Sequence, residues 1–222
     1  MPHIPLFCDR QEAGEKLAQA VLQEIKQLEL LTPANPIVYA LPRGGLPVAE
    51  PVARSLNCPL DVIVAKKVTR PENSELAIGA VTADGYVMRS RQNAFIQPHG
   101  GSWRLALQEA QIKAQEQLEQ FAASRPQVDP KGAIAILVDD GIATGMTMAV
   151  AARALRSKRP AKIFICAPVA PLGLVNLLKH WGDRVIILAA PETFLSVSRF
   201  YAEFPQVEIE EALACLGRQN QG

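Results

Sequence analysis

Short runs of apolar residues alternate with amphipathic stretches along most of this chain. Strands buried on both faces of a parallel sheet have such continuous apolar runs. The runs predict strands at 37–41, 61–66, 133–138, 161–168 and 184–189. Amphipathic spacing predicts helices at 9–30, 47–56, about 144–157 and 172–181. This strand–helix alternation favours an α/β fold, in which a parallel sheet carries helices on both faces.

One stretch interrupts the alternation. Short apolar segments at 77–83 and 86–89 precede a long helix at 103–123 that is rich in Gln and Glu, and 126–131 reads as a linker. We interpret about 91–128 as a helical insertion within a single domain that covers residues 1–222, a length sufficient for one buried core.

Composition narrows the classes of function and location. With 49% hydrophobic residues, 20% charged residues and a net charge of +1, the chain gives no support for nucleic-acid binding. The four cysteines show no Cys-x-x-Cys spacing, which argues against structural zinc and fits a reducing cytoplasm. No apolar run is long enough to cross a membrane, so none is expected to do so.

The most informative motif follows the predicted strand 133–138. Two adjacent carboxylates, Asp139 and Asp140, are followed by a small, hydroxyl-rich loop at 143–147 and then by a helical pattern. Carboxylates accept hydrogen bonds and suit sugar hydroxyls, whereas N–H groups at a helix N-terminus bind phosphate. A ligand with both groups, such as a ribose 5-phosphate, fits this combination.

Two other interpretations of the motif compete with this one. Asp-Asp could merely end a strand, with Thr-Gly beginning a helix. A phosphoaspartate enzyme of the Asp-x-Asp type is also conceivable, but Gly141 stands two positions after Asp139 and rules it out.

The acid pair and a loop ending in Thr-Gly-x-Thr resemble the signature by which type I phosphoribosyltransferases bind 5-phosphoribosyl 1-diphosphate (PRPP). The resemblance spans nearly the whole chain, including 75–80 and 200–204, and is strongest to bacterial members whose acceptor is unassigned. It implies a three-layer, parallel-sheet phosphoribosyltransferase fold with a small C-terminal hood region. It also implies that Asp139 and Asp140 hold the ribose, and that the 5′-phosphate is bound by Ala143, Thr144, Gly145, Met146 and Thr147.

Two upstream segments extend the resemblance to the diphosphate. Leu41-Pro42-Arg43-Gly44-Gly45 ends a predicted strand, and Lys66 and Lys67 end the next one. By resemblance Arg43, Gly44, Lys66 and Lys67 bind pyrophosphate, and the Arg43–Gly44 peptide bond is strained or cis. Lys67 joins Asp139 and Asp140 as a catalytic residue, on a loop that closes over the diphosphate. The alternatives are an ordinary strand–turn–helix junction and solvated lysines.

The acceptor is least defined by the sequence. The resemblance places the base beside the C-terminal region, about 191–222, with Phe194 and Tyr201 as stacking candidates; the alternative is that both rings belong to the core. Enzymes for 6-oxopurines carry an Asp where this chain has Ala143, and a Lys where it has Val169-Ala170-Pro171. A hypoxanthine or guanine acceptor is therefore disfavoured.

The implied reaction moves ribose 5-phosphate from PRPP to a nitrogenous base or related acceptor, with release of pyrophosphate. Mg²⁺ would bind together with PRPP through the substrate's own phosphates, with no direct protein ligand expected. Dimers are common in the resembled fold, so a homodimer is also implied. A PRPP- or nucleotide-binding regulator without turnover is the main alternative, and hydrolysis of a ribose-phosphate ester at the same site is a third.

Overall fold

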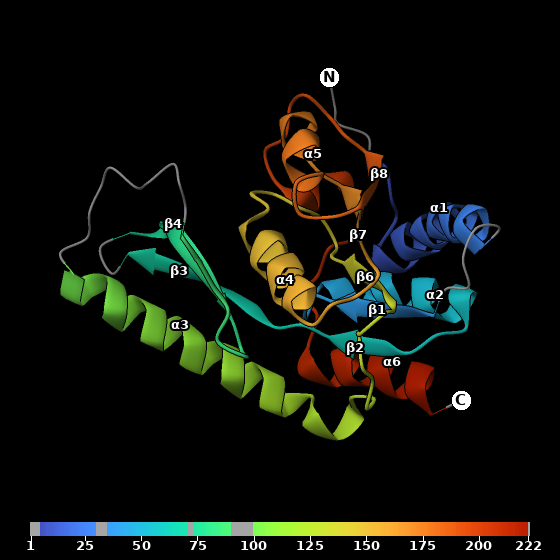
Figure 1. Cartoon of the computed structure of the whole chain (residues 1–222). Coiled ribbons are helices and arrows are strands. Elements are labelled where there is room, and N and C mark those ends of the chain that lie inside the picture. Colours follow the sequence, from blue (N-terminus) through green and yellow to red (C-terminus); the bar gives the residue numbers. More distant parts are fainter. Residues whose placement is uncertain (1–4, 30–34, 71–72, 90–99, 222) are drawn as a thin grey trace.

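The computed structural model describes residues 5–29, 35–70, 73–89 and 100–221. A five-stranded parallel sheet forms its centre, and a separate arm of strands and one helix extends from it (Figure 1). In spatial order the central strands are β2 (Leu60–Val62), β1 (Pro36–Ala40), β6 (Ile134–Val138), β7 (Lys162–Val169) and β8 (Arg184–Ala189). All neighbouring pairs are parallel, which confirms the predicted α/β fold.

Side chains on the two faces of the sheet pack into two hydrophobic cores. Val38 and Ala40 pack against α1 (Arg10–Glu29), α2 (Gly45–Leu56) and α6 (Ile209–Asn220). Ile37 and Tyr39 point to the other face, which is covered by α4 (Met146–Ser157) and α5 (Leu172–Leu178). Because successive strand residues face opposite sides, one apolar run supplies both cores.

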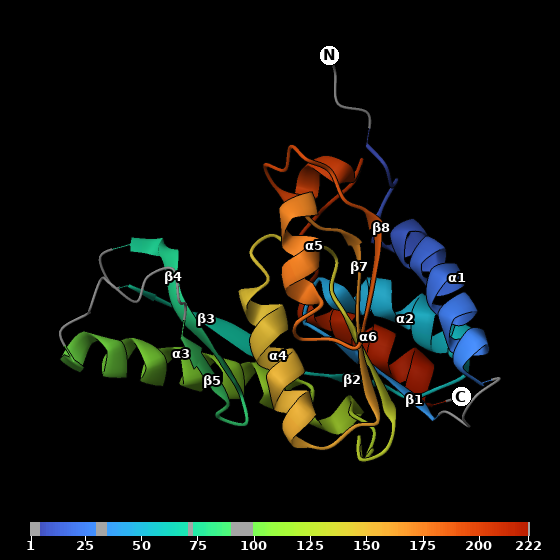
Figure 2. The same ribbon diagram turned by 45° about the horizontal axis from the view of Figure 1, so that its top comes forward.

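The arm is an antiparallel sheet backed by one long helix. Its strands are β3 (Ala65–Arg70), β4 (Asn73–Thr82) and β5 (Val87–Arg89), and its helix is α3 (Gly100–Gln120). Val68, Ile78 and Val81 pack against Ala106 and Ala110 of α3. Figures 1 and 2 both show α3 running along this hairpin from the outer tip of the arm toward the parallel sheet.

The structure corrects one boundary of the predicted strands. The predicted strand 61–66 is two strands in different sheets, because the chain leaves the parallel sheet after Val62 and the Val64 carbonyl accepts a hydrogen bond from Ala83 at 3.0 Å. The helix α3 packs on the hairpin that precedes it in sequence, and an insertion with the bounds of about 91–128 stays a prediction.

A buried ion pair fixes the end of the arm to the central sheet. After the 3₁₀ turn η1 (Ala122–Ser124), Arg125 donates from Nε and Nη2 to both oxygens of Asp61 at 2.6 and 2.9 Å. Asp61 lies on β2, so this contact joins the two parts of the molecule.

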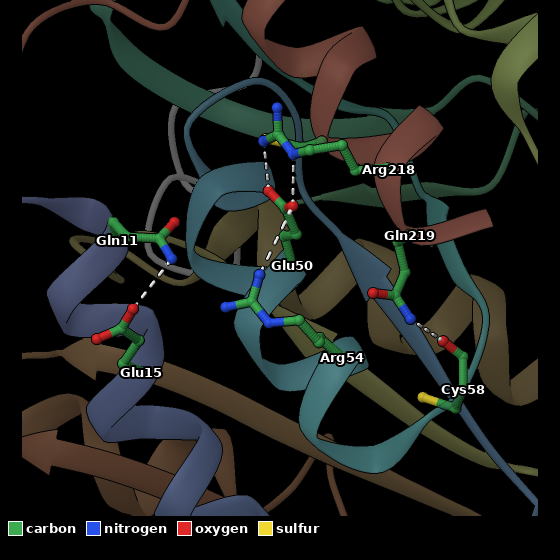
Figure 3. Close-up of polar contacts among 8 residues, drawn as sticks. Gln11, Glu15, Glu50, Arg54, Cys58, Arg218 and Gln219 are labelled. Atoms are coloured by element: carbon green, nitrogen blue, oxygen red, sulfur yellow. Dashed lines mark hydrogen bonds and ion pairs between the residues drawn. The ribbon is translucent and has the colours of Figure 1, made fainter. Parts of the chain in front are cut away.

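The C-terminal helix α6 is attached by a second buried carboxylate, Glu50 of α2 (Figure 3). Arg218 donates to both Glu50 oxygens at 2.7 Å, and Gln219 donates to the Cys58 carbonyl at 2.9 Å. Burial raises the pKa of Glu50, but the hydrogen bonds from Arg218 and Cys215 and the charges of Arg218 and Arg54 together leave the pKa lowered. Glu50 is therefore an ionised structural residue.

The first helix begins as its sequence predicts. The Glu12 N–H donates to Oδ1 of Asp9 at 2.8 Å, which confirms Asp9 as the capping residue. No helix in the described parts of the chain is long and apolar enough to cross a membrane.

Candidate functional site

A cavity of about 330 Å³ lies at the carboxyl ends of β1 and β6, where open α/β sheets bind ligands. Its walls include the acid pair Asp139–Asp140, the loop residues Arg43 and Gly44, and Thr147 of α4. Sequence segments about 100 residues apart therefore meet in one place because β1 and β6 are neighbours in the sheet.

Asp140 is held from three directions. Its own N–H donates to Oδ1 of Asp139 at 2.9 Å, and Arg10 donates from Nε to its Oδ2 at 2.8 Å. The hydroxyl of Tyr201 donates to the Asp140 carbonyl at 2.6 Å. The Asp140 side chain nevertheless stays 15% exposed, so it opens into the cavity from a fixed position.

The two carboxylates differ in their electrostatic surroundings. Burial raises the pKa of Asp139 well above its usual range, and the nearby charge of Asp140 raises it further. Burial also raises the pKa of Asp140, but the hydrogen bond and charge of Arg10 oppose that rise. Arg10 therefore favours the ionised form of Asp140.

The loop after β1 approaches the acid pair closely because it has glycines there. A Cβ on Gly44 would overlap the carboxylate of Asp140, and one on Gly45 would lie 2.9 Å from the Val138 carbonyl oxygen. The cis peptide bond of this loop joins Pro42 and Arg43, so the expected position at Arg43–Gly44 was wrong by one residue. Gly44 follows as the residue before α2 and has helical angles (φ −59°, ψ −31°).

The predicted phosphate loop ends at the N-terminus of α4. Gly145 has a φ of +71°, a conformation that favours glycine, and α4 begins at the next residue. Thr147 lines the cavity, whereas Ala143 and Thr144 are exposed and Met146 is half-buried. The geometry offers backbone N–H groups and a helix dipole to an anion at this end of the cavity.

The two lysines of β3 point in opposite directions, as neighbouring strand residues do. Lys66 is half-buried and shares a second cavity with Arg43, whereas Lys67 is exposed and lines neither cavity. Lys67 lies on the same face of β3 as Ala65, which does line the first cavity. Burial lowers the pKa of Lys66, and the charges of Arg43 and Lys113 lower it further.

Neither aromatic candidate for base stacking lines the cavity. Tyr201 is 4% exposed and its ring contacts Phe7 and Phe204, with centroids 5.4 and 4.8 Å away. Phe194 stacks on Phe200 at 5.3 Å. Both rings pack in the cluster that joins the N-terminal segment to the C-terminal region, and their stacking on a base stays a prediction.

Sequence reasoning missed four residues that do line the cavity, namely Arg10, Ala65, Gln206 and Val207. Arg10 follows the capping residue Asp9 and reads as an ordinary first-turn residue. Its partner Asp140 is 130 positions away, and no local pattern connects them. Gln206 and Val207 lie between the aromatic cluster and α6, in a stretch without a recognisable motif.

The described residues contain no group of three or more His, Cys, Asp or Glu side chains arranged to hold a metal ion. Asp139 and Asp140 supply two carboxylates at one side of the cavity. That donor set suits a cation that enters with a substrate and keeps most of its other ligands from phosphates and water.

Known proteins share both the sequence and the fold. The family model described as "Phosphoribosyl transferase domain" matches residues 9–186. Protein Rv0571c of Mycobacterium tuberculosis is 36% identical over 214 residues. Its name describes it as an inferred phosphoribosyl transferase. That match covers 96% of this chain and 47% of the relative, so the chain spans about half the length of the curated relatives it matches.

Two solved structures extend the comparison. The crystal structure of TT1426 from Thermus thermophilus is 33% identical with a TM-score of 0.78, and the match covers 96% of this chain and 98% of that one. The AQ2163 protein from Aquifex aeolicus is 15% identical with a TM-score of 0.54, covers 87% and 85% of the two chains, and shows a shared fold alone. With a parallel α/β sheet and a family model matched over most of its length, the chain belongs to the phosphoribosyl transferase domain family.

Proposed function

We propose that this protein transfers ribose 5-phosphate from PRPP to a nitrogen nucleophile and releases pyrophosphate. The observation that carries the proposal is the convergence of three parts on one cavity: the acid pair after β6, the glycine loop after β1 and the start of α4. Groups that accept hydrogen bonds from sugar hydroxyls thus lie beside groups that donate hydrogen bonds to a phosphate, as binding of a sugar phosphate requires.

Each part of PRPP then has its own residues. Asp139 and Asp140 accept hydrogen bonds from the ribose hydroxyls, and the 143–147 loop donates to the 5′-phosphate. Arg43 and Gly44 meet the diphosphate, with Lys66 and Lys67 on the neighbouring strand as further cations. In this scheme catalysis comes from positioning the sugar and from neutralising the leaving diphosphate.

The acid pair also bears on the transition state. Departure of pyrophosphate leaves positive charge on the sugar ring, as in glycoside chemistry. Ionised Asp140, held by Arg10 at 2.8 Å, supplies negative charge from a fixed position without reorganising.

Mg²⁺ is the cation that this chemistry calls for. It would neutralise the diphosphate, with the oxygens of Asp139 and Asp140 the protein groups that face it or its waters. The remaining ligands would come from PRPP and water, since the described part of the chain offers no larger carboxylate cluster.

The acceptor would meet different residues from those expected. With Phe194 and Tyr201 outside the cavity, Gln206 and Val207 are two lining residues of the C-terminal region that no part of PRPP uses in this scheme. Ala143 provides no carboxylate for a purine ring nitrogen, which favours an acceptor other than a 6-oxopurine.

The test is pyrophosphate release with Mg²⁺, PRPP and a panel of purines, pyrimidines and simple amines. Acceptor-dependent release is the expected result, and it should vanish in the Asp139→Asn, Asp140→Asn double variant. Binding of PRPP without release for any acceptor would contradict the transferase and support the regulator. Release of pyrophosphate without any acceptor would indicate hydrolysis instead. The cytoplasmic location and the homodimer stay predictions.

A further inference from the structure

A second cavity, of about 400 Å³, lies beside the first and shares Arg43 with it. Its other walls are Lys66 of β3 and four residues of α3: Lys113, Glu116, Gln117 and Gln120. Most of this cavity is therefore built by the arm, the part of the molecule that departs from the alternating strand–helix pattern.

Positive charge dominates the cavity. Three cations, Arg43, Lys66 and Lys113, line it together with a single carboxylate, Glu116. Lys113 pairs with Glu109 at 2.6 Å and Arg43 lies 3.6 Å from Glu208, but no carboxylate of the described residues lies within 4.0 Å of the Lys66 ammonium. Burial lowers the pKa of Lys66, and the positive charges of Arg43 and Lys113 beside its ammonium lower it further. A bound anion would offset these positive charges.

Two amide side chains add neutral hydrogen-bonding capacity. Gln117 and Gln120 lie on the same side of α3, three residues apart. The buried Oε1 of Gln117 has no hydrogen-bond partner among the described residues. The amide can therefore turn toward a ligand without breaking a bond to its oxygen, and it then offers two N–H donors.

We propose that this second pocket binds a phosphoryl or carboxylate oxyanion, with Lys113 of α3 as a charge contributed by the arm. Lys66 and Arg43 supply the remaining charge, and Gln117 and Gln120 supply amide donors. Because Arg43 belongs to both pockets, the oxyanion comes either from the diphosphate end of PRPP or from a separate anionic ligand bound next to it.

The experiment compares Lys113→Gln with Arg104→Gln by calorimetric titration of inorganic pyrophosphate. Both variants remove one positive charge from α3, and Arg104 is exposed and lines neither cavity. Loss of one charge-assisted contact should weaken pyrophosphate binding by roughly tenfold in Lys113→Gln. Arg104→Gln should change it by less than about twofold, as expected of a distant, screened charge.

A parallel titration with Mg²⁺ and PRPP identifies the source of the oxyanion. Weaker PRPP binding in Lys113→Gln would show that the diphosphate end reaches this pocket. Unchanged PRPP binding, together with weaker pyrophosphate binding, would show that it serves a separate anion.

The proposal is overturned if the wild-type protein does not bind pyrophosphate, or if Lys113→Gln and Arg104→Gln bind it equally well. It does not depend on turnover. A protein that binds pyrophosphate through Lys113 but never releases it from PRPP would keep this inference while losing the proposed function.

Discussion

Arg10 links the first helix of the chain to Asp140: its Nε donates to Oδ2 of the carboxylate at 2.8 Å across 130 positions of sequence. The same guanidinium donates from Nη1 to the Pro205 carbonyl at 2.7 Å and lies 3.6 Å above the ring of Phe204. The contact therefore joins α1, the acid pair and the C-terminal segment. It fixes Asp140 and favours its ionised form.

Replacing Arg10 with Gln should weaken binding of Mg²⁺ and PRPP by roughly tenfold, the usual loss when a hydrogen bond to a buried charge is removed. Burial raises the pKa of Asp140 and Arg10 opposes that rise, so the pKa increases when Arg10 is absent. If ribose binding needs ionised Asp140, the acidic loss of PRPP affinity should move to higher pH in the variant. Calorimetry at a series of pH values from neutral to acidic measures this. Arg10→Lys, which keeps a cation, should retain more of the wild-type pH profile. An acidic limb that does not move would contradict the role given to Arg10.

Asp139→Asn should make the fold more stable while reducing PRPP affinity. The pKa of Asp139 is raised in the folded state, first by burial and then by Asp140, so the ionised carboxylate destabilises the fold above that pKa. The asparagine Oδ1 can still accept from the Asp140 N–H, which donates to Asp139 at 2.9 Å in the wild type. We expect a gain on the order of 1 kcal/mol in the free energy of unfolding at pH 7.

The gain in stability of Asp139→Asn should disappear at acidic pH below the pKa that Asp139 has in the unfolded chain, where Asp139 is protonated in both states. Denaturant unfolding at several pH values tests this, and a stability loss at pH 7 would be the contrary result.

Gly44→Ala should abolish PRPP binding because a Cβ at this position would overlap the carboxylate that Arg10 holds in place. Either the loop after β1 or Asp140 must then move. Gly173→Ala is the matched control, since a Cβ on that exposed helical glycine meets nothing within 4 Å. Calorimetry measures the PRPP affinity of both variants, and thermal melting checks that both are folded. Equal PRPP affinity in the two variants would show that the close approach of Gly44 to Asp140 is unimportant.

Arg125→Gln should lower the free energy of unfolding by about 2–3 kcal/mol. This is a low value for the loss of a buried ion pair, because the Arg125 side chain is 32% exposed. The substitution leaves Asp61, whose side chain is 4% exposed, without its partner. Glu109→Gln breaks the exposed pair with Lys113 and should cost no more than about 0.5 kcal/mol. Urea denaturation compares the two, and similar costs would contradict the structural role of the Asp61–Arg125 contact.

Local patterns were enough to predict the parallel sheet. Strands such as 133–138 are buried on both faces, so their sequences are apolar throughout and their ends are marked by polar or glycine residues. The acid pair and the loop to Thr147 could be found for the same reason, because all their residues are contiguous.

The arm and the clamp on Asp140 could not be predicted in this way. The division of 61–66 depends on which distant strand each half pairs with, namely β1 for Leu60–Val62 and β4 for the residues from Ala65 onward. Arg10 and Asp140 meet only after both ends of the chain have packed against the sheet. Tyr201 is an aromatic residue of the kind that stacks on a base. The hydrogen bond from its hydroxyl to the Asp140 carbonyl and the burial of its ring follow from tertiary packing.

The central claim is that the acid pair holds the ribose of PRPP, and the most direct measurement is the dissociation constant of PRPP with Mg²⁺ for wild-type protein and for Asp140→Asn. Asp183→Asn serves as the control, because Asp183 is an exposed carboxylate paired with Arg156 that does not line the cavity. We predict that the wild type and the control bind PRPP alike, and that Asp140→Asn binds at least roughly tenfold more weakly, as expected when a charged hydrogen-bond acceptor is lost. Equal affinity for all three proteins would contradict the account.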